Sequence, residues 1–163
     1  MLRSDYDNQV CSIARALEVV GERWTLLVLR DIFLGNRRFD ALQGHLGVAR
    51  NVLQSRLERL LEHGVIEKVP YQERPVRHEY RLTPKGIDLW PTIVSLLQWG
   101  DRHALAPAGP PVLLRHKECG GEVDGHRICT ACGTPLEARD VRAVAGPGAA
   151  PDHPLLRRES SAA

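Results

Sequence analysis

The sequence predicts a mostly α-helical protein with a small β-hairpin, an α+β fold, followed by a small unit that carries most of the cysteines. Three observations lead to this prediction. Apolar residues recur at helical spacing through much of residues 12–105, an alternating stretch interrupts them at 65–82, and three of the four cysteines lie between residues 116 and 134. A length of 163 residues suits one domain with a small appendage.

The composition is that of a globular protein. The hydrophobic share of 43% and the charged share of 26% are ordinary, and no apolar run reaches the roughly 18 residues that a membrane span needs. The start, MLRSDYDNQV, has neither the apolar region nor the cleavage site of a signal peptide. We therefore expect a cytoplasmic protein that has no membrane partner and whose cysteines are kept reduced.

Positive charge is concentrated in the middle of the chain. The formal net charge of the whole chain is +2, whereas residues 35–85 hold ten Lys or Arg against six Asp or Glu, a local net charge of +4. A local excess of this kind is typical of a surface that binds phosphates.

Two helices are expected before residue 36. Ser12 is expected to be the N-cap of the first helix and Gly21 to end it. The second helix lies within RWTLLVLRDIFLG (23–35) and is apolar around most of its circumference. Such a helix is expected to be buried, either in the core or in a subunit interface.

Two further helices follow in the basic region. A short one is expected over 38–45, with a turn at Gly47, and a longer one over 49–63, which Gly64 ends. Four leucines form one face of the longer helix at helical spacing: Leu53, Leu57, Leu60 and Leu61. The opposite face is neutral and polar over its first turns and acidic only near its end, which suits a helix that presents its first turns to DNA.

Alternating residues then predict a hairpin. The strands are expected at 65–69 and 76–82, joined by a loop over 70–75, and the tip carries Arg74 and Arg77. Thr83 and Pro84 begin another helix that is expected to run to about residue 105, with a bend at Pro91. A short helix, a turn, a longer helix and a hairpin in this order predict a winged helix-turn-helix.

The stretch from Cys11 to about Gly100 resembles the HxlR family of bacterial transcription regulators, which are winged-helix proteins related to MarR. The resemblance is carried by GERWTLLVLRDIFLGNRRFDAL (21–42), NVLQSRLERLLEHGVIEK (51–68) and RPVRHEYRLTPKG (74–86). It implies a homodimer, held largely by its terminal helices, that binds a pseudo-palindromic operator in double-stranded DNA. The two recognition helices would then lie in successive major grooves, about 34–36 Å apart.

The predicted domains follow from these patterns. Residues 1–10 are expected to be a mobile arm, 11–105 the DNA-binding and dimerisation domain, 106–111 a linker, 112–142 a zinc-ribbon-like unit and 143–163 a disordered tail.

Eight residues are predicted to contact DNA. Base edges in the major groove would be read by Arg50, Asn51, Gln54 and Ser55. Phosphates or the minor groove would be contacted by Arg37, Arg38, Arg74 and Arg77. The alternative for each arginine is an ordinary solvated surface charge, and for Arg56 and Arg59 both interpretations stay open.

A wide apolar stripe follows the hairpin. It contains Leu89, Ile93, Leu96 and Trp99, with Trp90 beside them. Some of these side chains belong to the core of one chain, but the stripe is too wide for a small domain alone. It therefore predicts a dimer interface.

The C-terminal cysteines form a metal-binding pattern. HKECGG (116–121) and CTACGT (129–134) share the form ligand-x-x-Cys-Gly, in which the glycine lets the backbone fold under the sulfur. The sequence predicts a structural Zn²⁺ site made of His116, Cys119, Cys129 and Cys132.

Four alternatives stay open for this cluster. Cys129 and Cys132 could form a redox pair, the ligands could hold an iron–sulfur cluster, or His126 could replace His116. The three thiols could also simply be packed in the interior. That would leave a unit of about thirty residues with almost no other core, and so small a unit is more often stabilised by a metal.

Cys11 precedes the first predicted helix, at a place where members of the resembling family commonly have a cysteine. Some of those members use it to sense oxidants or electrophiles, and a thiol near a helix N-terminus can be reactive. Cys11 is therefore a candidate redox sensor, and an electrophile or another small molecule a candidate effector. The alternative is a small buried hydrophobic residue at the dimer interface.

Three classes of function are compatible with these patterns. The first is a dimeric, sequence-specific transcriptional regulator. The second is a small zinc enzyme, disfavoured by the fourth apparent ligand and the lack of an HExxH motif. The third is an adaptor that binds proteins through its zinc-ribbon-like unit. The first, which is not an enzyme, is the prediction.

Overall fold

The computed structural model describes residues 6, 9–104, 107–151 and 153. The chain divides into two compact units, Met1–Gly86 and Ile87–Ala163. The domain boundaries expected from the sequence stay predictions. Most of the expected arm (1–10), the first residue of the expected linker (106–111) and much of the expected tail (143–163) lie outside the described residues.

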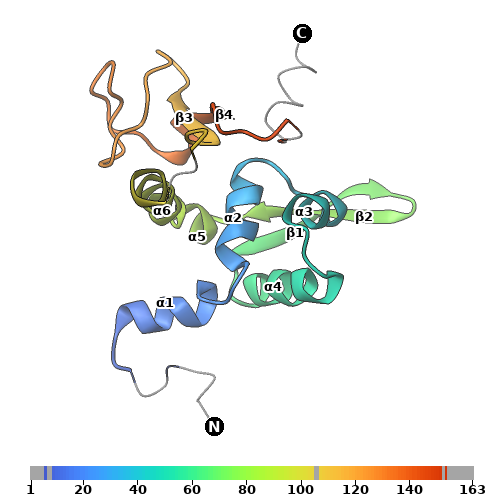
Figure 1. Cartoon of the computed structure of the whole chain (residues 1–163). Coiled ribbons are helices and arrows are strands. Elements are labelled where there is room, and N and C mark those ends of the chain that lie inside the picture. Colours follow the sequence, from blue (N-terminus) through green and yellow to red (C-terminus); the bar gives the residue numbers. More distant parts are fainter. Residues whose placement is uncertain (1–5, 7–8, 105–106, 152, 154–163) are drawn as a thin grey trace. The chain divides into compact units, whose positions relative to one another are not determined.

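The first unit is a winged helix-turn-helix, as the sequence predicts (Figure 1). Its elements are α1 (Ser12–Val20), α2 (Thr25–Phe33), α3 (Phe39–Leu46), α4 (Arg50–Glu62), β1 (Ile66–Glu73) and β2 (Val76–Leu82). The chain continues through α5 (Pro84–Ile87), α6 (Trp90–His103), β3 (Val112–His116), a short 3-10 helix (Ala138–Asp140) and β4 (Val141–Ala145).

The core of the first unit lies between α2, α3 and α4. Its fully buried side chains are Val28, Leu29 and Ile32 from α2, Leu42 from α3, and Leu53, Leu57 and Leu60 from α4. Burying each such side chain stabilises the fold by about 1.5–3 kcal/mol. The predicted leucine face of α4 is therefore buried, except that Leu61 is only half-buried.

A buried carboxylate connects α2 to α3. Asp31 is completely buried, yet its two oxygens lie 2.7 Å from Nη2 of Arg30 and 2.5 Å from Nδ1 of His45. Buried carboxylates need partners of this kind because an unpaired charge inside a protein is costly. The sequence pattern did not predict this contact.

Gly47 and Gly64 lie at helix ends, as predicted, whereas the N-cap predicted for α1 is wrong. Gly47 and Gly64 both have a φ of 64°, the left-handed conformation that ends α3 and follows α4. Ser12 was expected as N-cap of α1, but the cap is Cys11, whose carbonyl accepts a hydrogen bond from the N–H of Arg15 (3.1 Å). The expectation was wrong because the helix begins one residue earlier than the polar side chain suggests.

The wing is longer and its turn tighter than expected. β1 and β2 pair antiparallel from Ile66 with Leu82 to Glu73 with Val76, so only Arg74 and Pro75 form the turn. The loop predicted over 70–75 is therefore wrong. A two-stranded ribbon tolerates a proline that cannot donate a hydrogen bond, and the register shift between Pro70 and Gln72 accommodates it.

The single helix expected from Pro84 to about residue 105 is in fact two helices. α5 ends at Ile87, and α6 begins at Trp90. Pro91 consequently lies in the first turn of α6, where no backbone N–H is needed, instead of bending a helix interior. On α6, Trp90 and Val94 are buried, whereas Leu96 is 48% and Trp99 57% exposed.

The second unit contains α6 and a C-terminal hairpin. β3 and β4 pair antiparallel from Val112 with Ala145 to His116 with Val141, so β4 runs past the domain boundary expected at residue 142. The side chain of Gln98 on α6 donates hydrogen bonds to the carbonyls of Val123 (3.0 Å) and Asp124 (2.6 Å). These bonds connect α6 to the segment between the two strands.

Candidate nucleic-acid interface and metal cluster

The first turns of α4 carry several exposed polar side chains. Arg50, Asn51, Gln54 and Ser55, the residues predicted to read base edges, are all exposed. One amide hydrogen of Gln54 is donated to Oε1 of Glu58 (2.9 Å), which orients the side chain along the helix. The structure thus leaves all four predicted residues exposed within the first two turns of α4.

Two of the predicted arginines lie over aromatic rings. The guanidinium carbon of Arg38 is 4.1 Å from the ring centre of Tyr71 on β1, and that of Arg50 is 4.6 Å from the ring centre of Phe39 on α3. In the described part of the chain, neither guanidinium forms a hydrogen bond or an ion pair with another residue. Both arginines therefore keep their N–H donors available.

Arg56 and Arg59, whose role was open, have partners inside the protein. Arg56 forms an ion pair with Glu22, and its Nε donates to the carbonyl of Arg23 (3.1 Å). Nε of Arg59 donates to the carbonyl of Glu18 (2.8 Å). These side chains attach α4 to α1 and to the segment that follows α1.

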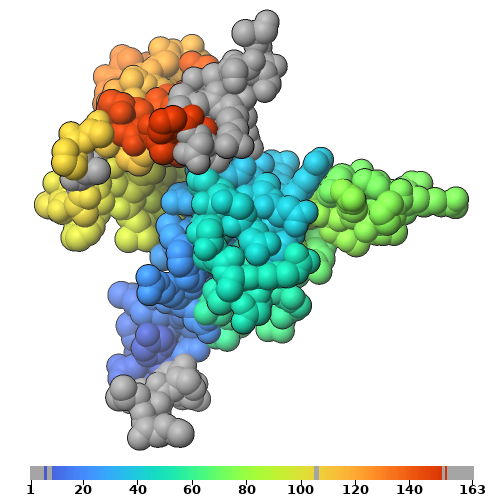
Figure 2. Space-filling model, turned by 45° about the vertical axis from the view of Figure 1, so that its right-hand side comes forward, coloured from blue at the N-terminus to red at the C-terminus, as the bar shows by residue number. Residues whose placement is uncertain are grey.

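Four of the predicted arginines lie outside α4. Arg37 and Arg38 precede α3, Arg74 lies in the turn of the wing and Arg77 follows it on β2, and all four are exposed. Both views of the molecule show the tip of the wing projecting away from α2, α3 and α4 (Figure 2). The N–H of Tyr80 donates to the carbonyl of Arg37 (2.7 Å), which fixes β2 against the start of α3.

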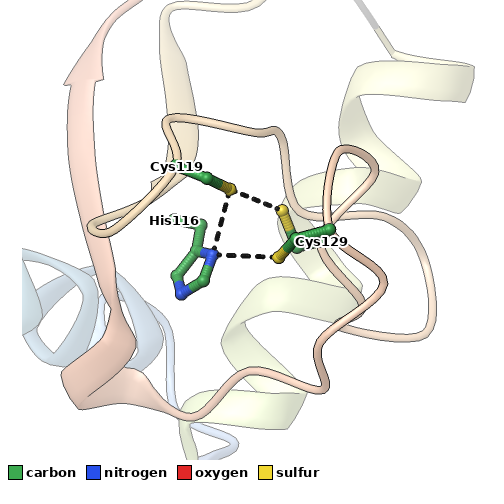
Figure 3. Close-up of side chains that lie close together, drawn as sticks. His116, Cys119 and Cys129 are labelled. Carbon is green, nitrogen blue, oxygen red and sulfur yellow. Dashed lines mark hydrogen bonds between the residues drawn. The ribbon is translucent and has the colours of Figure 1, made fainter.

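In the second unit, His116, Cys119, Cys129 and Cys132 form a cluster whose ligand atoms all lie within 4.8 Å of one another. Nδ1 of His116 lies 3.2 Å from Sγ of Cys119 and 3.4 Å from Sγ of Cys132, and the Sγ atoms of Cys119 and Cys129 are 3.3 Å apart. Figure 3 shows the labelled side chains pointing toward one another. This is a Cys3His cluster that could hold a metal ion.

The two halves of the cluster have the same backbone hydrogen bonds. The carbonyl of His116 accepts from the N–H of Gly120, and the carbonyl of Cys129 accepts from that of Gly133, both at 2.9 Å. The two glycines have φ values of 74° and 73°, which L side chains rarely adopt. The predicted ligand-x-x-Cys-Gly turns are therefore two copies of one local structure.

A third glycine, Gly121, lies where there is no room for a side chain. A Cβ atom on Gly121 would lie 2.5 Å from Sγ of Cys129, closer than atoms can approach. Gly121, which follows the first turn, consequently lies directly beside Sγ of Cys129 in the second turn.

The thiols of the second turn ionise more easily than ordinary cysteines. The side chain and the backbone N–H of Thr134 lower the pKa of Cys132 to about 6. The backbone N–H groups of Cys132 and Ala131 lower the pKa of Cys129. Thiolates are the form in which cysteine binds metals.

Two of the alternatives for the cluster do not fit this geometry. His126 is exposed and is not among the four clustered residues. Cys129 is buried, but Cys119 and Cys132 are exposed, so the three thiols are not simply packed in the interior.

Cys11 is an exposed free thiol at the start of α1. The backbone N–H groups of Ala14 and Ile13, in the first turn of the helix, lower its pKa. A reactive thiol has this environment.

Three residues make contacts at or beside these sites that the sequence did not predict: Phe39, Tyr71 and Gln98. Each contact joins side chains or backbone groups of different elements of the fold. No sequence pattern specific to such contacts was present.

A two-stranded wing behind a helix-turn-helix with an exposed polar recognition helix defines the class of winged helix-turn-helix DNA-binding regulators. Within this class, the chain belongs to the HxlR family. The family model for the HxlR-like helix-turn-helix matches residues 19–107, which is more than half of the chain.

Curated relatives are regulators of the same type. An uncharacterised HTH-type transcriptional regulator of Mycobacterium tuberculosis, Rv3095, is 53% identical over 137 residues, covering 84% of this chain and 87% of the relative. The regulator sll1512 of Synechocystis is 35% identical over 92 residues, covering 56% of this chain and 68% of the relative.

Solved structures show the same similarity. PA1607, described as a candidate transcription factor, is 41% identical with a TM-score of 0.66, covering 82% of this chain and 93% of that one. The transcriptional regulator YodB of Bacillus subtilis, in its reduced form, is 26% identical with a TM-score of 0.50, covering 58% of this chain and 95% of that one. HypR, a redox regulator, is 24% identical with a TM-score of 0.54 and shares the fold, covering 57% of this chain and 97% of that one.

These findings establish the general function. The protein is an HTH-type transcriptional regulator with DNA as its partner, and its family consists of regulators instead of enzymes. Among the described residues, no helix is both long and apolar enough to cross a membrane.

Proposed function

We propose that the protein is a homodimer that recognises a pseudo-palindromic operator through α4. Arg50, Asn51, Gln54 and Ser55 would read base edges in the major groove. The observation that supports this most is the exposure of all four in the first two turns of a helix whose leucines are fixed in the core.

The arginines around α4 would contact the DNA backbone or the minor groove. Arg37 and Arg38 lie at the start of α3, and Arg74 and Arg77 lie in the 70–78 wing. Their exposure and the absence of acidic partners within the described residues support this role. Arg56 and Arg59 are excluded from the proposal, because the protein itself already binds both of them.

The dimer is supported by apolar side chains that one chain leaves exposed. Leu96 and Trp99 on α6 are about half exposed, and Ile13 on α1 is 70% exposed. Exposed apolar side chains of this size on the terminal helices are typical of a subunit interface. The family resemblance implies a dimer held by the same helices.

We infer that the metal is a structural Zn²⁺ ion held by His116, Cys119, Cys129 and Cys132. Three sulfurs and one imidazole match the preferences of zinc, and four protein ligands would leave no open position for catalysis. When bound, such an ion would connect the two turns through all four side chains. An iron–sulfur cluster or a Cys129–Cys132 disulfide would be the alternative outcomes.

Cys11 would provide a redox input. Its exposure and its lowered pKa support reaction with oxidants or electrophiles. The position at the start of α1 means that a modification there would act on a helix to which Arg59 of α4 is bonded.

Replacing Arg77 by Ala should weaken DNA binding about equally on all sequences and lower the slope of log affinity against log salt by about one. The measurement is fluorescence anisotropy with DNA from upstream of the coding region, and with scrambled DNA, over a range of salt concentrations. Arg59→Ala is the matched control and should lower stability while leaving the slope unchanged. Equal slopes for Arg77→Ala and wild type would remove Arg77 from the interface.

The same assay tests base readout. Gln54→Ala should relax the preference at one operator position, because an amide that pairs with a base edge is lost. If a panel of mutated operators keeps its rank order with this variant, Gln54 does not read bases.

The dimer is tested by light scattering. The wild-type protein should have a dimer mass, and Trp99→Glu should shift it toward the monomer because a charge would replace an apolar contact. A wild-type mass equal to one chain at every concentration would contradict the dimer.

The metal assignment is tested by elemental analysis of the purified protein. One zinc per chain is expected, and chelation should increase the number of reactive thiols by three. Cys129→Ser should lose the zinc, whereas the matched variant Cys11→Ser should keep it. Coloured protein with iron, or a Cys129–Cys132 disulfide without metal, would overturn the assignment.

The redox input is tested with diamide. Oxidation should release wild-type protein from DNA, and Cys11→Ser should stay bound. Zinc content is followed in the same samples to detect damage to the cluster. Release of the variant at the wild-type diamide concentration would exclude Cys11 as the sensor.

A further inference from the structure

Two aromatic residues that lie beside the predicted interface have guanidinium groups over their rings. Tyr71 on β1 lies under Arg38, with 4.1 Å between the guanidinium carbon and the ring centre. Phe39, the first residue of α3, lies under Arg50, the first residue of α4, at 4.6 Å. Both rings are half-buried, whereas both arginines are exposed.

This arrangement suits an arginine that must bind an anion or a base edge. A guanidinium on a ring face is held by the charge distribution of the ring, while its N–H donors point outward around the edge of its plane. A carboxylate partner would instead occupy those donors. Arg56 illustrates that case, because its donors bind Glu22 and the carbonyl of Arg23.

We propose that Tyr71 and Phe39 are positioning residues for DNA recognition, which rests on the proposed roles of Arg38 and Arg50. Tyr71 holds the Arg38 guanidinium ready for a phosphate, and Phe39 holds that of Arg50 ready for a base edge. Less conformational freedom is then lost on binding, since each arginine is already oriented in the free protein.

The two contacts also connect three elements of the interface. Arg38 and Phe39 are neighbours in the chain, so Tyr71 on the wing, the start of α3 and the start of α4 are linked through adjacent residues. The hydrogen bond from the N–H of Tyr80 to the carbonyl of Arg37 holds the second strand of the wing at the same place. A change in the wing can therefore alter Arg38, the residue that directly precedes α3.

The proposal is tested at Tyr71 with two variants that differ in the ring alone. Tyr71→Leu removes the ring and should weaken operator binding by about twofold to fivefold, whereas Tyr71→Phe keeps the ring and should bind like wild type. Arg38→Lys keeps the charge but not the planar group that stacks, so it should show a similar loss. Binding is measured by anisotropy, and thermal unfolding confirms that each variant is folded.

A double-mutant cycle shows whether Tyr71 acts through Arg38. With Arg38→Ala in place, Tyr71→Leu should have no further effect on affinity. If the two losses simply add, Tyr71 acts independently of Arg38 and the positioning role is overturned. If Arg38→Ala weakens binding but Tyr71→Leu does not, the ring is unnecessary and the proposal also fails.

The second ring is tested by base preference. Phe39→Leu should reduce discrimination at the operator position that Arg50 reads, and Phe39→Tyr should retain it. With Arg50→Ala in place, Phe39→Leu should leave the remaining preference unchanged. Unaltered discrimination by folded Phe39→Leu would overturn this half of the proposal.

These experiments separate the proposal from the function on which it rests. If Arg38→Ala and Arg50→Ala both bind the operator like wild type, the DNA contacts proposed for these arginines are wrong. If both weaken binding while the aromatic variants do not, the contacts are correct and only the positioning role is wrong.

Discussion

The burial of the α4 leucines is the interaction on which the proposed DNA-binding surface depends. Leu53, Leu57 and Leu60 are almost completely buried, together with apolar side chains of α2 and α3. Rotating α4 about its axis would expose them at a cost of about 1.5–3 kcal/mol for each side chain. The polar residues of the first turns therefore have one stable orientation, and the surface proposed to read DNA is fixed by packing within the protein.

The parts of the fold that were predicted correctly are those that local chemistry determines. Leucines at helical spacing indicated α4, and glycines at positions 47 and 64 marked helix ends, where both adopt left-handed backbone conformations. The incorrect predictions concern boundaries that other elements decide. Pairing with β2 extends β1 past Pro70, and the chain breaks between Ile87 and Trp90, so Pro91 falls where a proline is harmless.

The same distinction applies to the two sites. The four clustered ligands were predicted because each half is a short turn whose glycine and cysteine are close in sequence. The rings under Arg38 and Arg50 and the bonds from Arg59 to Glu18 were not, since those partners meet only after folding. Sequence patterns can therefore indicate which arginines are candidates for binding DNA. Only the fold shows which of these arginines form hydrogen bonds or ion pairs within the protein.

The hydrogen bonds from Gln98 connect α6 to the segment that carries three of the cysteines. Residues 106–111 have the composition of a linker, yet α6, which precedes them, supplies two hydrogen bonds to carbonyls beyond them. A protein truncated at that linker would keep Gln98 and lose both acceptors. The helix and the hairpin that carries the Cys3His cluster should consequently be expressed, exchanged between relatives and compared as one piece.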